Sequence, residues 1–572
     1  MIEMNMFKRV IVLFFAVFLQ CAIVFAQAES SNKGLLNVKN NKAIGDGIAD
    51  DTKAIQETIN KAAEGDTVFI PEGTYLVRAI GLKSGVHIKS EGLLTQQIDG
   101  EKEGFSISRQ NSSAPLFRGK DISNVSLSFR AQTLNEAVYL SGSRDVVITK
   151  STLMGDSTKI QSFAGILLYD CENISIEKTT ISHYGSERTD PAIYQPGTAV
   201  RILSSNNISV IHCNILDNGE NGVFIHESPD VEVSNNRLLN NGMSAIQVAF
   251  GSKSIEKNYK FINNLMEGNA ADAIDINNRS PREFLDINCL IRDNISRRNG
   301  FVKGESTRDG SGIATLVNVS GVEILNNTAE KNNRPSLYIE DCGNIYATGN
   351  QSDNQVEVVE RFQELNLSNN TFSIVSLLAN VKGKKLMLDN NKLHSLSLPN
   401  GIHVDSLILR NNIIANANLN FNMTGNVEMV GNTVASNAKD GAILIVRVNS
   451  AHLEKNQIVS TQSQAITIRN LAENVCIIDN DIKSINTCIY DDGSKGLNVT
   501  GNKLVSLKGG RFRHTMVSRN PNQLFLSNNV HVSGRRESAL RLEGQGTAQI
   551  IEEEIKWGYA EYGSVEVKET ID

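Results

Sequence analysis

The chain is poor in tryptophan, proline and cysteine, and it has no excess of basic residues. Among 572 residues there are one Trp, nine Pro and seven Cys, and the formal net charge is −7. Scarce Pro and a moderate 43 Gly argue against collagen-like and disordered chains. The mildly acidic balance gives no support to nucleic-acid binding. With 40% hydrophobic and 21% charged residues, the chain should fold, either as several ordinary domains or as one repetitive domain.

A long apolar run is also lacking, except near the N-terminus. There Lys8 and Arg9 precede "VIVLFFAVFL", and small residues stand at Ala26 and Ala28. This pattern predicts a signal peptide over residues 1–28, cleaved near Ala26–Ala28. A lipoprotein anchor at Cys21 fits less well, because Gln20 stands where a small residue is expected. Cleavage removes a net charge of +1 and leaves −8. We expect a secreted or periplasmic chain without a membrane contact after cleavage.

Six cysteines remain after such cleavage, and none belongs to a CxxC or Cys/His cluster with metal-ligand spacing. We interpret them as small buried side chains. An exported chain could also form one or two disulfides, and the sequence does not select a pairing. We predict no metal site and no cofactor. The six residues are Cys171, Cys213, Cys289, Cys342, Cys476 and Cys488.

One asparagine recurs through the chain in the slot apolar–x–x–Asn–x–apolar. Fourteen such positions cover 315 residues in thirteen steps, a mean spacing near 24. A period of about 20–50 residues is typical of solenoids. The positions are Asn214, Asn236, Asn264, Asn294, Asn327, Asn350, Asn370, Asn391, Asn412, Asn432, Asn456, Asn480, Asn502 and Asn529.

Between these asparagines, apolar residues alternate with a period of two. "GVFIHES" and "SLILRNN" place Ile, Val or Leu at every second position, and no ten-residue helix fits inside the period. The repeat therefore predicts an all-β parallel β-helix, whose coils stack about 4.8 Å apart. We expect the asparagines to hold the bends with left-handed backbone angles and to hydrogen-bond along the stack.

The start of the repetitive region resembles a known family. "GDGIADDTKAIQETI" (Gly45–Ile59) and "VFIPEGTYLV" (Val68–Val77) resemble the opening of pectate-lyase superfamily proteins related to rhamnogalacturonases and polygalacturonases. The resemblance implies a right-handed parallel β-helix. Asp50, Asp51 and Thr52 suit the start of a short helix that caps the solenoid. A catalytic acid cluster that includes Asp46 is the alternative.

The resemblance implies an enzyme acting on acidic polysaccharides such as pectin, but the superfamily also contains epimerases and non-enzymatic fibres. The sequence departs from its best-known branches. The Asn-Thr-Asp, Asp-Asp, Gly-His-Gly and Arg-Ile-Lys motifs of the glycoside-hydrolase branch are not found on successive coils. The Asp-Pro-His-Asp signature of alginate epimerases is also missing. Some relatives use Ca²⁺, but no spacing of oxygen ligands supports a calcium site here.

A candidate site follows from aligning the first strand of each coil, starting at Gly165, Ala199, Gly222, Ala245, Ala273, Gly312 and Leu337. The second and fourth residues should point inward, and the third and fifth outward. Polar and aromatic residues then gather on one outer face, where they form a predicted sugar-binding floor. The floor comprises Arg201, Phe224, His226, Gln247, Asp275 and Asn277, with Tyr169, Asp170, Glu227 and Arg279 at its edges.

Two long insertions precede strands of this face, at His183–Gly197 and Arg297–Gly312. Long loops on a regular scaffold are often functional, so we expect them to wall a groove, although ordinary surface loops are the alternative. They would contribute Tyr184, Glu187, Arg188, Asp190, Tyr194, Lys303, Glu305, Arg308 and Asp309.

Two chemistries could use this floor. Hydrolysis needs two carboxylates, and Glu227 and Asp275 lie two coils apart, about 9.6 Å, near the upper end of the inverting range of about 6.5–9.5 Å. Asp170 or a loop carboxylate is an alternative partner. β-Elimination needs a cation for the uronate carboxylate, such as Arg201 or Arg279, and a base such as His226. His226 could equally be an ordinary surface histidine.

We therefore expect residues 29–65 to form an N-terminal cap, 66–550 the β-helix and 551–572 a C-terminal cap or tail. The function predicted is cleavage of a uronate-containing polysaccharide by hydrolysis or β-elimination. A non-catalytic glycan-binding or adhesive solenoid is the alternative. The sequence does not indicate an oligomeric state.

Overall fold

The computed structural model describes residues 34–97, 115–156, 164–251, 257–278, 284–422, 424–469, 471–507, 514–533 and 538–570. The predicted signal peptide and Arg279 lie outside the described residues. No helix within the described ranges is long and apolar enough to cross a membrane.

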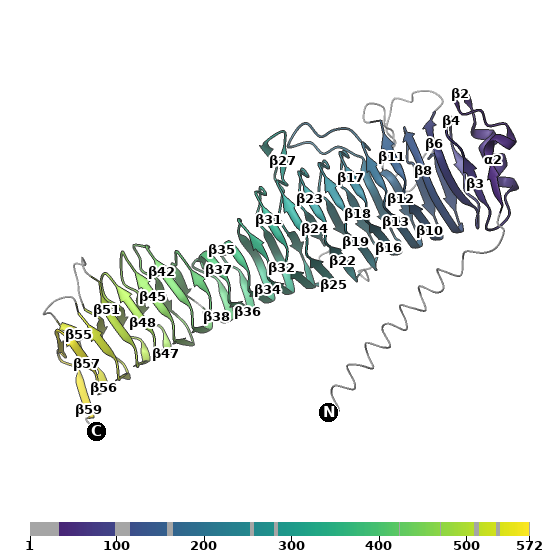
Figure 1. Cartoon of the computed structure of the whole chain (residues 1–572). Coiled ribbons are helices and arrows are strands. Elements are labelled where there is room, and N and C mark those ends of the chain that lie inside the picture. Colours follow the sequence, from purple (N-terminus) through teal and green to yellow (C-terminus); the bar gives the residue numbers. More distant parts are fainter. Residues whose placement is uncertain are drawn as a thin grey trace, which may run out of the picture.

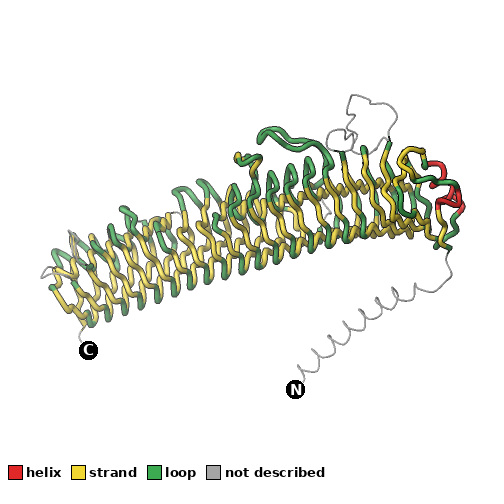
Figure 2. Tube along the Cα trace, turned by 45° about the horizontal axis from the view of Figure 1, so that its top comes forward, coloured by secondary structure: helices red, strands yellow, loops and turns green. Residues whose placement is uncertain are grey.

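The chain winds into one elongated solenoid with three faces, and every strand pair of its wall is parallel (Figures 1 and 2). The first face runs from β5 (Ile80–Gly81) to β58 (Tyr559–Glu561). The second runs from β1 (Leu35–Asn37) to β59 (Glu566–Thr570). The third runs from β2 (Asp46–Asp50) to β57 (Glu554–Trp557). The predicted right-handed parallel β-helix is confirmed.

The coils that carry the candidate site have the following strands. The first face holds β12 (Ala164–Tyr169), β15 (Thr198–Leu203), β18 (Val223–His226), β21 (Ile246–Ala249), β24 (Ile274–Asn277), β29 (Ala314–Val317) and the start of β32 (Leu337–Thr348). The second face holds β16 (Asn206–Ile211), β19 (Val231–Ser234), β22 (Tyr259–Ile262), β25 (Leu285–Arg292) and β30 (Val319–Leu325). The third face holds β17 (Asn214–Leu216), β20 (Arg237–Leu239), β23 (Leu265–Glu267), β26 (Ile295–Arg297) and β31 (Thr328–Glu330).

The core is a continuous apolar column inside the coils. Along β18, Val223 and Ile225 are fully buried, whereas Phe224 and His226 between them are partly exposed. This alternation follows from the two-residue period of a strand, and stacking coils bring apolar side chains of the same kind into contact. Burial of aliphatic side chains at about 1.5–3 kcal/mol each, repeated in every coil, is the main source of stability.

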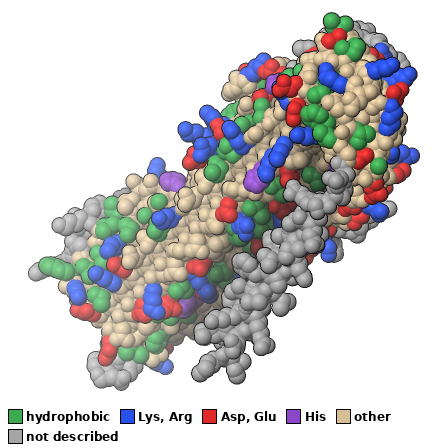
Figure 3. Space-filling model, turned by 45° about the vertical axis from the view of Figure 1, so that its right-hand side comes forward, with side chains coloured by type: hydrophobic (Ala, Val, Ile, Leu, Met, Phe, Trp, Pro, Cys, Tyr) green, Lys and Arg blue, Asp and Glu red, His purple; other side chains and the backbone are tan. Residues whose placement is uncertain are grey.

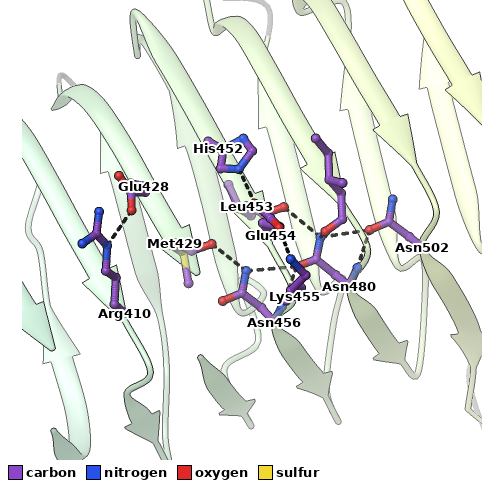
Figure 4. A network of polar contacts seen from close by, with 11 residues as sticks. Arg410, Glu428, Met429, His452, Leu453, Glu454, Lys455, Asn456, Asn480 and Asn502 are labelled. Carbon is purple, nitrogen blue, oxygen red and sulfur yellow. Dashed lines mark hydrogen bonds and ion pairs between the residues drawn. The ribbon is translucent and has the colours of Figure 1, made fainter. Parts of the chain in front are cut away.

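The repeated asparagines form a buried ladder at the corner between the second and third faces. Asn456 Nδ2 donates to Asn480 Oδ1 over 2.9 Å and to the Met429 carbonyl over 2.8 Å, and Asn480 Nδ2 donates to Asn502 Oδ1 over 2.9 Å (Figure 4). The same pattern links the predicted positions from Asn236 to Asn529. The predicted stacking is confirmed, since each amide satisfies backbone groups that the bend removes from the strands.

Two details of that prediction are wrong. The ladder begins with Cys213, whose backbone N–H donates to Asn236 Oδ1, while Asn214 is exposed as the first residue of β17. The left-handed angle also belongs to the preceding residue: Asn235 has φ 57° and Asn369 has φ 57°. The buried asparagine therefore supplies hydrogen bonds, and its neighbour supplies the unusual backbone.

The N-terminal end of the solenoid carries the predicted short helix, α2 (Thr52–Lys61), with Ile55 and Ile59 buried. Asp50 Oδ1 accepts the Thr52 backbone N–H over 3.0 Å. Asp51 Oδ1 instead accepts the Ile44 N–H over 2.6 Å. These carboxylates hold the local turn at the end of the solenoid, far along the chain from the candidate site.

At the other end, the segment expected as a cap or tail contains β57, β58 and β59, which pair with the preceding coil. The ladder ends there as well, because Asn529 Nδ2 donates to Glu553 Oε1 over 2.9 Å. The six predicted buried cysteines are free thiols, and Cys476 alone among them is partly exposed. Burial raises the pKa of Cys171 and of Cys213 to about 11.

Candidate functional site

The predicted floor residues share one outer face of the solenoid. Arg201 pairs in register with Phe224, Phe224 with Gln247, and Gln247 with Asp275. A second row places His226 beside Ala249, which is beside Asn277. Residues distant in the sequence thus become neighbours about 4.8 Å apart.

The predicted alignment slips by one residue in the last two strands. Thr315 pairs with Asp275, and Tyr338 pairs with Thr315, so both side chains point outward. The starts at Gly312 and Leu337 would have turned them inward, because a shift of one residue exchanges the two faces of a strand. Thr315 and Tyr338 therefore join the site, although the sequence prediction did not include them.

Both predicted insertions rise from the same edge of the solenoid (Figure 1). We call residues 183–197 the strap and residues 301–309 the flap; the flap begins with the hairpin of β27 (Phe301–Val302) and β28 (Glu305–Ser306). Tyr194 of the strap donates its hydroxyl to Asp309 Oδ2 of the flap over 2.5 Å. The two insertions therefore meet, as expected of walls around a groove.

Arg188 fastens the strap. Its guanidinium donates to the carbonyls of Asp190 over 3.2 Å, Pro191, and Gly242 over 2.8 Å, and it lies 4.3 Å from the centre of the Tyr194 ring. Tyr184, which we expected on the groove wall, is instead fully buried, and its hydroxyl lies 2.9 Å from Thr133 Oγ1. The strap thus starts from an anchor inside the solenoid.

A cavity of about 380 Å³ lies on the first face beside the contact between strap and flap. We call it the inner cavity. Its lining comes from the floor, the flap, the strap and the turns that precede the first-face strands. The residues are Tyr194, Met243, Ser244, Gln247, Ala271, Asp272, Asp275, Asn277, Arg308, Asp309, Ser311, Thr315, Arg334, Pro335 and Tyr338.

Asp272 is a buried carboxylic acid in this lining. Only 6% of its surface is exposed, and Oδ1 accepts the backbone N–H groups of Ser311 over 2.6 Å and Gly310 over 3.1 Å. Burial, together with the nearby charge of Asp309, raises its pKa above the ordinary value of an aspartate, although the two amide donors oppose the shift. Burial and like-charge repulsion favour a protonated Asp272.

Asp275 lies on the floor in a different setting. Gln247 Nε2 donates to Asp275 Oδ2 over 2.9 Å, and Asn221 Nδ2 donates to Gln247 Oε1 over 2.9 Å. Because Asn221 fixes the oxygen of the Gln247 amide, its nitrogen must face Asp275. Asp275 is 9% exposed. The cavity therefore holds two aspartates in different settings: Asp272 lies against backbone amides, and Asp275 accepts a side-chain amide on the floor.

Two arginines supply positive charge at the rim. Arg308 and Arg334 are exposed, and among the described residues no carboxylate lies within ion-pairing distance of either guanidinium. Burial and the hydrogen bond to Asp309 raise the pKa of Tyr194 to about 12, so its hydroxyl keeps the proton at neutral pH. Acidic and basic side chains are interspersed on the face drawn in Figure 3.

The remaining predicted residues lie along the same face but outside the inner cavity. His226 Nδ1 lies 3.1 Å from the Ala249 carbonyl, and Glu227 Oε2 lies 3.4 Å from Ser204 Oγ. Tyr169 and Phe224 pack on an outer apolar cluster that includes Leu167 and Leu203. Asp170 follows β12 at the turn. Of the predicted floor and wall residues, the cavity unites Tyr194, Gln247, Asp275, Asn277, Arg308 and Asp309.

Arg201 lies beneath the surface. It is 1% exposed, pairs with Glu220 Oε2 over 3.2 Å and lies 4.4 Å from the centre of the Phe224 ring. Thr198 donates to the same Glu220 oxygen over 2.7 Å. The arginine thus supports the floor from within.

Asp272 is the main residue that the sequence analysis missed. It is aligned with Ser244, because each carbonyl accepts an N–H from the preceding coil: Ser244 from Gly222, and Asp272 from Ala245. The sequence did contain a signal for Asp272: the neighbouring coils have Ser244 and Ser311 at this position, where this coil has an acid.

A second asparagine ladder was also missed, five residues after the first. Asn218 Nδ2 donates to Asn241 Oδ1 over 2.9 Å, Asn241 Nδ2 to Asn269 Oδ1 over 2.8 Å, and the series continues through Asn299 to Asn332. It lies in the turns beneath the strap and flap.

The described residues contain no group of three or more His, Cys, Asp or Glu that could hold a metal ion.

Comparisons with known proteins agree with this architecture. Residues 103–294 match the family described as "Right handed beta helix region". A plasmin and fibronectin-binding protein A of Streptococcus pneumoniae is 22% identical over 500 residues, which cover 83% of this chain and 57% of that protein. A mannuronan C5-epimerase of Azotobacter vinelandii is 27% identical over 253 residues, which cover 40% of this chain and 17% of the enzyme.

The chain thus spans little more than half of the first relative and less of the second. Among solved structures, a family 28 exopolygalacturonase of Yersinia enterocolitica aligns with a TM-score of 0.42 and 15% identity, over 67% of this chain and 78% of the enzyme. The fold implied by the resemblance at the start of the chain is confirmed: the protein is a right-handed parallel β-helix.

Proposed function

We propose that the inner cavity binds a uronate-containing polysaccharide and hydrolyses one of its glycosidic bonds. The observation that carries the proposal is the pair of aspartates that line one cavity: Asp272, whose pKa is raised by burial, and Asp275 on the floor. Two carboxyl groups of this kind are what glycoside hydrolysis requires. The substrate class has a second, weaker support, because one relative is an epimerase of mannuronan, which is a uronate polymer.

In the proposed reaction, Asp272 is the general acid. Its proton passes to the leaving glycosidic oxygen as the bond to the anomeric carbon breaks. Asp275 accepts a proton from the attacking water, whose oxygen forms the new bond to the anomeric carbon. The proton then returns to Asp272 through solvent, so that one water is consumed for each bond cleaved.

The other lining residues bind and orient the substrate. Arg308 and Arg334 are placed to pair with uronate carboxylates, because a guanidinium can bind a carboxylate with two parallel hydrogen bonds. Asn277 and Gln247 offer amides to sugar hydroxyls. The contact between Tyr194 and Asp309 limits the cavity on the side of the insertions.

β-Elimination is less well supported than hydrolysis. The base that we expected for it, His226, lies outside the inner cavity, and Arg201 is buried against Glu220. A non-catalytic glycan-binding site is the second candidate. It is favoured by the two backbone N–H groups that Asp272 accepts, because such bonds also suit a carboxylate that only fixes the flap.

The deciding experiment is digestion of a polysaccharide panel that includes polygalacturonate and alginate. Hydrolysis predicts new reducing ends without absorbance at 235 nm, which unsaturated products would give. Asp272→Asn and Asp275→Asn should each abolish turnover. Glu323→Gln is the matched control, because Glu323 is exposed on the second face of the next coil. Absorbance at 235 nm, or retained activity in both variants, would exclude the proposed mechanism.

A further inference from the structure

A second and larger cavity lies on the other side of the strap and flap. It has a volume of about 450 Å³, and we call it the outer cavity. Four chain segments line both cavities: the strap, residues 240–244, residues 268–277 and the flap. Gly242 and Ala270 border the outer cavity, and their neighbours Met243 and Ala271 border the inner one. The outer cavity therefore lies over the turns of the second asparagine ladder, beside the first face.

The floor of the outer cavity is held in place by hydrogen bonds of the second asparagine ladder. Asn218 and Asn241 border it, and both are nearly fully buried. Asn218 Oδ1 accepts the Tyr184 N–H over 3.1 Å, and Asn241 Oδ1 accepts from Asn218 Nδ2 over 2.9 Å. A site whose polar groups are already fixed loses little conformational entropy when a ligand binds.

The charges around the outer cavity balance, since Arg188 and Lys303 face Glu187 and Asp217; His183 also lines it. Arg188 donates to three backbone carbonyls, and Lys303 Nζ lies 3.7 Å from Glu187 Oε1. Asp217 also borders the cavity and is exposed. This balance suits a neutral sugar unit, because a carboxylate would meet two acidic side chains beside cations that already have partners. This balance differs from that of the inner cavity, where Arg308 and Arg334 have no ion-pair partner among the described residues.

The flap adds an apolar wall. Phe301 is half-buried, Val302 is buried, and both line the cavity together with Ala270. An aromatic ring offers a flat apolar surface to the C–H face of a sugar, while amides and carboxylates hydrogen-bond to its hydroxyls. A concave site with an apolar platform and a few fixed polar groups is typical of ligand binding.

We propose that the outer cavity is a second saccharide-binding site, and that it takes a neutral sugar unit. The unit is either part of the polymer that enters the inner cavity or belongs to a separate glycan. The proposal does not depend on cleavage in the inner cavity, because the outer cavity would hold its ligand whether or not a bond is broken.

The test uses the full chain with Asp275→Asn, so that no probe is cleaved. Neutral galacto-, arabino-, xylo- and manno-hexasaccharides are titrated by calorimetry, together with an oligogalacturonate. We expect at least one neutral probe to bind, and Phe301→Ala to weaken that binding at least tenfold. Asp217→Asn should weaken it as well; Asn tolerates the left-handed φ of 57° at this position, so the turn is kept.

The matched control is Arg334→Gln in the inner cavity, which should leave the neutral probe unaffected and weaken the oligogalacturonate. If a heteropolymer that contains both kinds of unit binds at least tenfold more tightly than either probe, one polymer fills both cavities. If it does not, the two cavities bind separate glycans. The proposal is overturned if no neutral probe binds, or if binding survives both Phe301→Ala and Asp217→Asn in variants that keep the melting temperature of the parent.

Discussion

The first asparagine ladder makes a quantitative prediction at Asn391, which is 1% exposed. Its Nδ2 donates to the Leu367 carbonyl over 2.7 Å and to Asn412 Oδ1 over 3.0 Å. Its Oδ1 accepts Asn370 N over 2.9 Å and Asn370 Nδ2 over 3.1 Å. Asn391→Asp keeps the shape and the two accepted bonds, but the ionised form cannot donate either of the other two.

The cost follows from those two lost bonds. The Leu367 carbonyl loses its Asn391 donor, which costs about 1–3 kcal/mol, whereas Asn412 Oδ1 keeps the Asn391 backbone N–H over 3.0 Å and loses one bond worth about 1 kcal/mol. The charge-assisted bonds of Asn370 offset part of the cost of burying the new carboxylate. We therefore expect Asn391→Asp to lower the local free energy of unfolding by about 2–4 kcal/mol at neutral pH.

The variant should also depend on pH. Two facing oxygens raise the pKa of the new carboxyl above its unfolded value of about 3.9. The folded state then binds the proton more tightly than the unfolded state, so stability is highest below the unfolded pKa and falls as pH rises toward the folded pKa. A protonated carboxyl can also donate one of the two lost bonds. Part of the loss should therefore be recovered near pH 4.

Hydrogen exchange of backbone amides, followed by mass spectrometry over residues 386–414, measures this effect locally. A local method is needed because a solenoid need not unfold in one step. Asn390→Asp is the matched control: Asn390 is exposed, and its φ of 54° suits Asp as well as Asn. Equal protection in the two variants would refute the idea that the buried amides hold the corner.

Three further predictions concern the site and the core. Turnover should fall at high pH as Asp272, whose pKa is raised by burial, loses its proton. If Asp272→Asn keeps turnover with the same alkaline limb, the acid role of Asp272 is excluded. Arg188→Lys should raise KM more than it lowers kcat, because a lysine cannot bond at once to the carbonyls of Asp190, Pro191 and Gly242. Steady-state kinetics with Glu323→Gln as the control would test this, and an unchanged KM would contradict it. A thiol reagent should label the buried cysteines of the native chain slowly at pH 8, because burial raises the pKa of Cys342 and of Cys488 to about 12. Labelling should become fast when urea unfolds the chain. Fast labelling of these two cysteines in the native chain would contradict the packed core.

Much of the fold could be predicted because its signals are periodic. The two-residue alternation identified strands, and the recurring asparagine identified stacked coils. The same periodicity explains the errors. Cys213 takes the place of an asparagine, so the slot was filled with Asn214 one residue later. The strands at Gly312 and Leu337 were likewise shifted by one residue, which hid Thr315 and Tyr338.

The site could be predicted only in part, because its walls depend on contacts between insertions. Gln247, Asp275 and Asn277 follow from strand register alone. The contact of Tyr194 with Asp309 spans 115 residues and has no periodic signal. Tyr184 and Arg188 were grouped as wall residues because both lie in one long loop. Their burial against Thr133 and under Gly242 emerges only from the folded chain.

The second asparagine ladder has a consequence for how proteins of this shape can change in size. Within the described residues it connects the coils from Asn218 to Asn332, whereas the later coils of Asn391 and Asn412 repeat after 21 residues and are joined by the first ladder. Whole coils could be inserted or deleted in that later region, because the flanking coils would again stack through the same asparagine corner. Such changes would leave the two cavities unchanged. The reach of the rod and the chemistry of its binding surface are therefore free to evolve independently.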